Sequence, residues 1–320
     1  MTTAAVEQLL DQAYAALEEG NADQAIALGK QLLEHRHARG FEIMALAYEL
    51  QGRYEEAVQT LKDGVSKVPA AWPLWELLGN LYSDSEETEQ AHQAYQQALQ
   101  CQGADTDSIN YNYAILLKRE NKFDKAWELT ERIHGTELQL KVLTLRLSLL
   151  RAMRRYEDAV HLGNRIIAEI LGQEDLPDES MQELARTYAE LGRAHWEGKG
   201  DRQSAWENAW KALEWDRSDA GALWLVREII GRKAATSHHW KLVVEGRWHF
   251  PLEPDKPPPG FITTYEVVAD TPEAALTYAQ DLEPVEVRQT MKMDSCEDMG
   301  AAAEENQGVY WRSGYGFYMK

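Results

Sequence analysis

Small residues recur along this chain at an almost constant interval. One small residue per repeat serves as a marker, and the intervals between markers are 32, 34, 35, 33 and 46 residues: Ala25, Ala57, Ala91, Ala126, Ala159 and Ala205. A period of this length is typical of proteins built by stacking one supersecondary unit many times. The spacing therefore predicts a solenoid of about six similar units in the first two thirds of the chain.

The stretch from Ala71 to Gln100 shows what the repeated unit is. Large and small apolar residues occur at helical spacing on each side of the polar break SDSEET: Trp75, Leu78, Gly79 and Tyr82, then Ala91, Tyr95, Ala98 and Leu99. Each set falls on one face of a helix. The small residues Gly79 and Ala91 allow the two backbones to approach closely. The pattern predicts a helical hairpin.

This pattern resembles the tetratricopeptide repeat, which carries Trp, Leu-Gly, Tyr, Ala, an aromatic residue and Ala at these points. The resemblance extends over about residues 6–235 and implies a mainly α, right-handed α-solenoid that binds other proteins. Other positions fit the same register, because Gly20 and Gly52 end first helices and Pro69 closes a repeat. The long last interval indicates an insertion between Ala168 and Leu184, with a solvated loop around Pro177, Glu174 and Asp175.

From His238 onward the helical period gives way to alternation. The runs predict strands at 241–248 and 261–270, a helix at 271–282, a strand at 285–294, a short helix at 296–306 and a final strand at 308–320. Thr271 and Pro272 are a typical helix start. The order ββαβαβ indicates a small two-layer α/β domain at 238–320, following a repeat domain at 1–235. Since no flexible linker separates Ile230 from Trp240, we expect this domain to pack on the last hairpin.

Composition narrows the class of protein. The chain has 53 acidic and 33 basic residues, a net charge of −20, which disfavours nucleic acid and anionic membranes and favours a basic partner or simple solubility. No apolar run long enough to span a membrane and no signal peptide can be identified, so we expect a cytoplasmic protein. Cys101 and Cys296 have no metal-ligand spacing, and we expect reduced thiols and no zinc site.

Motifs for catalysis are absent from the sequence. None of GxSxG, GxxxxGK[ST] or HExxH occurs, so we expect a non-enzymatic protein without a cofactor or metal. Weaker candidates for a metal site are two histidine pairs, His35 with His37 and His238 with His239. A second set could converge on the C-terminal sheet as an active site: Arg247, His249, Tyr265, Arg288 and Arg312. Glycines among aromatic residues in the last run could let a ligand approach: Gly308, Gly314 and Gly316. For these residues the sequence favours solvated histidines, sheet bends and core packing over a functional site.

Some tetratricopeptide-repeat proteins grip the terminal carboxylate of a chaperone peptide with five polar residues. By resemblance, Asn80, Asn112 and Lys141 match positions of that clamp. Glu76 and Leu145 stand where basic residues are needed. A carboxylate at Glu76 would repel the group that the clamp holds. The sequence therefore disfavours a chaperone clamp, although the asparagines can bind a peptide backbone.

The family register places a set of first-helix residues on the concave groove as candidate partner-binding residues: Glu42, Glu76, Asn80, Tyr111, Asn112, Lys118, Lys141 and Arg151. Acids lead toward the N-terminus and bases follow, so we expect a protein or peptide segment oriented by charge, with Tyr111 as its central apolar anchor. The function expected is an interaction module or adaptor. Two alternatives stay open: an acidic inhibitor or immunity-type protein that masks a basic effector, and a small-ligand or catalytic role of the C-terminal domain. The oligomeric state is not indicated.

Overall fold

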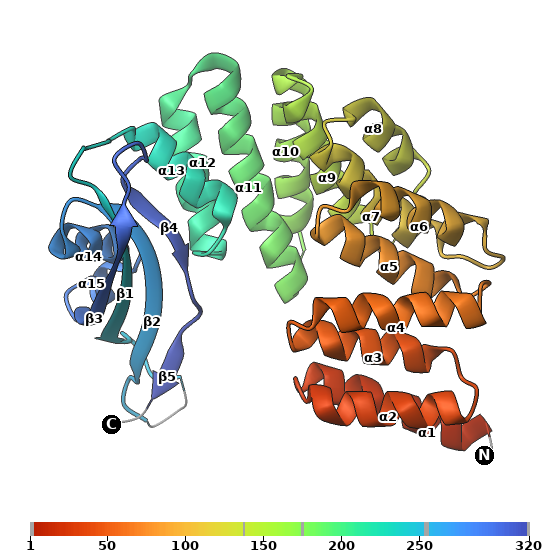
Figure 1. Cartoon of the computed structure of the whole chain (residues 1–320). Helices are drawn as coiled ribbons and strands as arrows, with labels where there is room; N and C mark the ends of the chain where they lie inside the picture. Colours follow the sequence, from red (N-terminus) through yellow and green to blue (C-terminus); the bar gives the residue numbers. More distant parts are fainter. Residues whose placement is uncertain (1–2, 137, 174–175, 253–255, 319–320) are drawn as a thin grey trace. The chain divides into compact units, whose positions relative to one another are not determined.

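The computed structural model describes residues 3–136, 138–173, 176–252 and 256–318 (Figure 1). The described part of the chain up to Ile230 consists of helices in six consecutive pairs and a closing helix: α1 Thr3–Glu18, α2 Ala22–Glu34, α3 Arg39–Leu50, α4 Tyr54–Lys67, α5 Trp72–Asp84, α6 Thr88–Gln100, α7 Thr106–Arg119, α8 Phe123–Glu131, α9 Gln139–Ala152, α10 Tyr156–Leu171, α11 Asp178–Lys199, α12 Arg202–Trp215 and α13 Ala220–Ile230. The prediction of about six hairpins is confirmed. Of the predicted insertion loop, Glu174 and Asp175 lie outside the described residues.

The chain divides into two compact units, 1–142 and 143–320, and the division falls within α9. In the described residues of the first unit every element is a helix, whereas the second unit contains α10 to α13 together with the C-terminal sheet. The division of the sequence into domains 1–235 and 238–320 stays a prediction about which parts fold independently.

Close helix contact at Gly79 holds the third hairpin together. A Cβ atom added to Gly79 would lie 2.8 Å from Cε1 of Tyr95 on α6, closer than a real Cβ contact allows. Tyr95 is 1% exposed and packs with Leu78, Ala91 and other apolar residues of the same core. The glycine predicted at the helix contact is therefore required by the packing of α5 on α6.

First helices end in a left-handed turn throughout the repeats. Gly20 and Gly52 have φ angles of 71° and 68°, which glycine adopts without steric cost. The same turn occurs at three residues that are not glycine: Glu86, Asn121 and Arg154. The repeat geometry therefore imposes this turn even where the local sequence does not favour it.

The C-terminal elements are β1 His238–Arg247, β2 Gly260–Ala269, α14 Pro272–Asp281, α15 Val285–Arg288, β3 Lys292–Ala301, β4 Gly308–Arg312 and β5 Gly316–Tyr318. The strands form an antiparallel sheet in the order β3-β1-β2-β4, with β5 also paired to β2. Helices α14 and α15 pack on the sheet. Thr271 accepts a hydrogen bond from the Ala274 N–H as the predicted N-cap.

The predicted order ββαβαβ is wrong in its second half. The expected strand at 285–294 begins as the helical turn α15, and the expected helix at 296–306 is largely strand β3. Val285 is 66% exposed, so the alternation of Val285 and Val287 does not mark a buried strand face. The alanine-rich segment extends because it pairs with β1, from Leu242 opposite Cys296 to His238 opposite Ala301.

The sheet packs on the closing helix α13, whereas the sequence predicts packing on the hairpin before that helix. Arg227 on α13 is 9% exposed, and its Nη1 donates a hydrogen bond to the Val309 carbonyl on β4 at 2.6 Å. The guanidinium lies 3.7 Å from the centre of the Tyr310 ring. The Gln307 N–H donates to the Arg232 carbonyl at 2.7 Å. Helix and sheet are therefore joined by buried polar contacts as well as by apolar packing.

Candidate functional site

The first helices α3, α5 and α7 are neighbours in the first unit, because α5 contacts both α3 and α7. Six of the predicted binding residues lie on these helices, and we call this set the first-helix face: Glu42, Glu76, Asn80, Tyr111, Asn112 and Lys118. Each is at least partly buried.

Glu76 is the polar centre of the first-helix face. Its Oε1 accepts a hydrogen bond from Ser108 Oγ at 2.6 Å and another from Asn112 Nδ2 at 3.0 Å. Two predicted residues, Glu76 and Asn112, are thus in direct contact. Ser108 was missed, although Ser108 and Asn112 are four apart in α7 and so share one helix face, a signal present in the sequence.

Glu76 as a residue is 9% exposed, and its carboxyl group has an altered proton affinity. Burial raises its pKa above the ordinary value of a glutamate, and the acids Asp105 and Glu42 raise it further. The hydrogen bonds from Ser108 and Asn112 act in the opposite direction. Both hydrogen-bond partners are neutral, so they stabilise the carboxylate without cancelling its charge.

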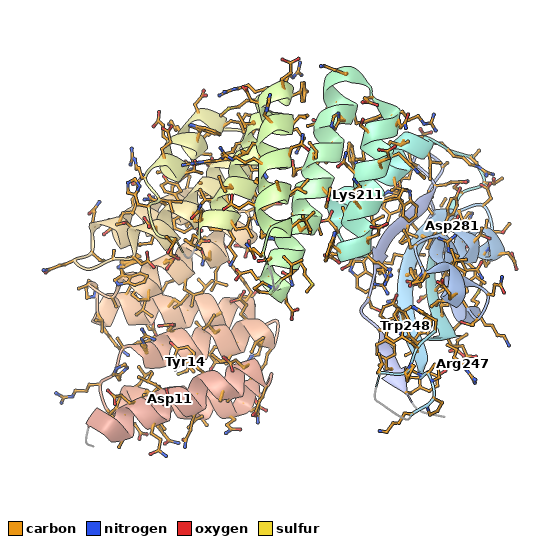
Figure 2. All side chains as sticks on the ribbon, turned by 180° about the vertical axis from the view of Figure 1, so that it is seen from behind. Asp11, Tyr14, Lys211, Arg247, Trp248 and Asp281 are labelled. Atoms are coloured by element: carbon orange, nitrogen blue, oxygen red, sulfur yellow. The ribbon has the colours of Figure 1, made fainter. Side chains whose placement is uncertain are left out.

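Glu42 extends the acidic character of this face onto α3. The hydroxyl of Tyr14 on α1, which is labelled in Figure 2, donates to Glu42 Oε1 at 2.9 Å and accepts from Arg39 Nη1 at 2.9 Å. Burial and the neighbouring Glu42 raise the pKa of Tyr14. The tyrosine therefore links α1 to α3 and holds Glu42 in place.

The other end of α5 contains a second polar group. Arg119 on α7 donates to Ser83 Oγ at 3.1 Å and to Asp84 Oδ1 at 2.9 Å. Asn80 lies on α5, and its Oδ1 accepts a hydrogen bond from the Tyr95 hydroxyl at 2.8 Å. Asn80 therefore helps to join α5 to α6. On α3, burial, and secondarily Asp84, raise the pKa of Glu49.

Lys141 and Arg151 both lie on α9, but they belong to different units. In the second unit Arg151 is tied to α11, because its Nε is 2.6 Å from Glu190 Oε2 and its Nη1 is 2.9 Å from Glu197 Oε1. Its side chain is 11% exposed. Burial works against the charge of Arg151, but the two carboxylates outweigh it and raise its pKa. Arg151 thus has acids of its own as partners.

The C-terminal sheet brings together only part of the set that the sequence nominates there. Tyr265 donates to Glu283 Oε1 at 2.6 Å, and Arg312 Nη2 lies 3.4 Å from the same oxygen. The Tyr315 hydroxyl donates to the other oxygen of Glu283, a residue that the sequence analysis missed. The side chain of Glu283 is fully buried. Burial, followed by the charge of Glu283, raises the pKa values of Tyr265 and Tyr315.

The remaining nominated residues do not join this cluster. Arg288 donates to the carbonyl oxygens of Asp281 and Glu283, and so closes the end of α14. His249 packs against Trp248 and Phe250. Arg247 lines a separate cavity of about 410 Å³ near Pro257 and Pro258. The cluster around Glu283 is a buried polar core of the sheet.

The two histidines at the start of β1 each lie beside one acidic side chain. His238 Nδ1 is 2.9 Å from Asp298, and His239 Nε2 is 2.7 Å from Glu305. Among the residues that the structure describes, no three or more of His, Cys, Asp and Glu are grouped as they would be around a metal ion. Cys101 and Cys296 are both free thiols. No helix within the described ranges has the length and apolar character needed to cross a membrane.

Comparison with known proteins identifies the repeats. Residues 73–103 match the model of the tetratricopeptide repeat family. These residues form the hairpin of α5 and α6. No curated protein matches the chain in sequence. The chain therefore contains a tetratricopeptide repeat, and solved structures show the same fold over a longer range.

Three of these structures have TM-scores above 0.5. The type IV pilus biogenesis factor PilW is 17% identical, with a TM-score of 0.51 over 61% of this chain and 84% of PilW. PilF of Pseudomonas aeruginosa is 16% identical, with a TM-score of 0.51 over 70% of this chain and 97% of PilF. The Cut9–Hcn1 hetero-tetramer of the APC/C gives 15% identity and a TM-score of 0.53 over 68% of this chain, but over only 41% of the matched chain. The helical region thus has the fold of a tetratricopeptide-repeat solenoid.

Proposed function

We propose that this protein is a non-enzymatic interaction module that holds a basic segment of a partner protein on the first-helix face of its first unit. The single observation that carries the proposal is the environment of Glu76. Its carboxylate is almost fully buried, its hydrogen-bond partners Ser108 and Asn112 are neutral, and a second acid, Glu42, lies near enough to raise its pKa. A lysine or arginine of a partner would supply the opposite charge that this site lacks.

The residues around Glu76 are suited to an extended segment. Asn112 donates one amide hydrogen to Glu76, and an asparagine side chain has further donor and acceptor capacity for a peptide backbone. Tyr111, beside it on α7, is partly buried and offers an aromatic surface. The fold shared with PilW, PilF and Cut9 supports an interaction or scaffold role. Charge would then set the orientation of the segment, and Tyr111 would supply much of the affinity.

Arg151 does not enter this proposal, since Glu190 and Glu197 already bind it. By the charge order of the sequence, an acidic part of the segment lies toward Lys118 and Lys141. The charge order predicted from the sequence is therefore kept, except that Arg151 is left out.

A peptide-display selection on the full chain tests the proposal directly. Sequences enriched on the wild-type chain should contain Lys or Arg, and selection on the Glu76→Lys variant should lose this preference, since the partner's cation would meet a like charge. Glu7→Lys on α1 is the matched control, because it makes the same charge change at an exposed position. Equal enrichment of basic residues on all three chains would contradict the proposed site.

Affinity measurements on a selected peptide then locate the anchor. We expect Tyr111→Ala to weaken binding by roughly 1–3 kcal/mol, mainly through faster dissociation, as truncation of an aromatic anchor does. Trp311→Ala, on the C-terminal sheet, is the comparison variant because Trp311 is 45% exposed and belongs to a different surface. If Trp311→Ala loses binding while Tyr111→Ala keeps it and both remain folded, the partner binds the sheet and the proposed face is wrong.

A further inference from the structure

A cavity of about 490 Å³ lies within the second unit, where α12 and α13 face α14 and β4. Its wall is mainly apolar and includes Trp206, Trp210, Leu223, Val226, Ile230 and Val309. A second hollow of about 430 Å³ adjoins it and shares Trp206 and Ile230. Trp206 therefore borders apolar space in both hollows.

The two tryptophans form an aromatic wall. Their rings meet edge to face, with centroids 5.7 Å apart and planes at 66°. Trp206 is 36% exposed although apolar residues surround it, and exposed apolar surface that lines a cavity is typical of a binding site. Trp215, on the same helix, is 38% exposed but does not line the cavity. The chain therefore provides its own matched control residue.

Two opposite charges stand at one end of this cavity. Asp281, labelled in Figure 2, ends α14. Its Oδ1 lies 3.6 Å from Arg288 Nη1. Other donors of Arg288 are bound by the carbonyl oxygens of Glu283 and Asp281. The polar end therefore offers both a hydrogen-bond acceptor and a donor, while its formal charges cancel.

We propose that this cavity binds an uncharged small molecule with a flat, apolar ring system. The ring lies against Trp206 and Trp210, and one neutral polar group such as an amine, amide or hydroxyl reaches Asp281 and Arg288. The volume falls in the range of small-ligand sites, and an apolar wall with a few placed polar groups is their usual construction. A charged ligand gains no net attraction, because the charges of Asp281 and Arg288 cancel at the polar end of the cavity. This inference is independent of the partner site in the first unit.

Titration of the full chain with N-phenyl-1-naphthylamine tests the proposal. This probe is uncharged, has flat aromatic rings and carries one N–H group, and its fluorescence rises in an apolar site. We expect saturable binding of one probe per chain, and about tenfold weaker binding to Trp206→Ala, because the stacking surface is removed. Trp215→Ala should bind as the wild type does. Equal affinity for the two variants, or absence of saturation, would overturn the site.

A second variant, which fills the cavity, tests whether the probe binds at this place. Val226→Phe adds bulk at the cavity wall, and we expect it to lose the probe while the circular dichroism spectrum stays unchanged. Probe binding that persists in a folded Val226→Phe chain would place the probe elsewhere and reject the proposal.

Charge selectivity is tested with 8-anilino-1-naphthalenesulfonate, which adds an anionic group to the same ring system. We expect weaker binding of the sulfonate than of the neutral probe. Asp281→Asn should narrow that difference severalfold, because it leaves the Arg288 charge unbalanced. Glu273→Gln, an equal charge change at an exposed position of α14, should leave the difference unchanged. If both variants narrow it equally, the polar end of the cavity does not contact the probe.

Discussion

The repeats of the first unit and the C-terminal sheet bury carboxylates in different ways. Among the residues that the structure describes, the hydrogen-bond partners of Glu76 are Ser108 and Asn112, which are both neutral. Glu283, inside the sheet region, meets two tyrosine hydroxyls and also lies 3.4 Å from Arg312. A buried acid with its own cation is held for structure, whereas one with neutral partners keeps a charge that a ligand can use. The difference separates a structural core from a candidate binding site.

The largest expected effect is that of removing Glu283, which tests whether this buried acid stabilises the sheet region. We expect Glu283→Ala to destabilise the sheet region by about 3–5 kcal/mol, because it leaves Arg312 buried without its opposite charge and two tyrosine hydroxyls without their acceptor. Urea unfolding followed by circular dichroism measures this loss.

Glu286→Ala is the control, since Glu286 is exposed on the adjacent α15 and its removal should change stability by less than about 0.5 kcal/mol. A similar small change for Glu283→Ala would show that the buried cluster does not hold the sheet together.

Substitution of Gly79 tests the packing that brings the first-helix face together. Gly79→Leu should destabilise the first unit by roughly 1–3 kcal/mol or more, because even a Cβ atom would lie 2.8 Å from the Tyr95 ring. Thermal unfolding provides the measurement. Gly314→Leu is a suitable comparison, because a Cβ atom there meets no atom within 4 Å. Equal melting curves for the two variants would refute the assigned helix contact.

The smallest expected effect is that of Glu76 protonation on the stability of the folded chain. Because burial raises its pKa, the folded chain binds this proton more readily than the unfolded chain does. The resulting stability is present at low pH and is lost as the pH rises through the raised pKa. Gln resembles the protonated acid and can accept the same hydrogen bonds, so Glu76→Gln should raise the melting temperature at pH 7.

The gain from Glu76→Gln should disappear below about pH 4, where the wild-type residue is itself protonated. Melting temperatures at several pH values measure it, with Glu7→Gln as the control at an exposed position of the same unit. If the rise in melting temperature of Glu76→Gln is the same at every pH, its cause is packing. Glu76 would then not be a buried, uncompensated charge.

Much of the repeat region could be predicted from sequence because each hairpin contacts its neighbours in the same way. The marker alanines, the glycine at the Gly79 contact and the turns at Gly20 and Gly52 all occupy the expected places. The sequence nominated all six residues of the first-helix face, but it did not identify Ser108, which binds Glu76, or Tyr14, which binds Glu42. Periodicity gives the face on which a residue lies, but not its hydrogen-bond partner.

The C-terminal sheet was predicted less well, since its contacts do not repeat. The strands β1 and β2 and the start of α14 were recognisable from alternation and from Thr271 and Pro272. The pairing that makes 292–301 an edge strand depends on β1, more than forty residues earlier in the chain. Local propensity at an alanine-rich segment cannot contain that information.

The repeat architecture, the positions of the first helices and the excess of acids follow from local spacing and composition, so they can be predicted from the sequence. The neutral partners of Glu76, the contact of Glu283 with Tyr265 and Arg312, and the cavity beside Trp206 and Trp210 become visible only in the folded chain. The reason is physical: hydrogen bonding, burial and enclosed volume depend on atoms brought together from distant elements, and each depends on the orientation of side chains that no single segment sets.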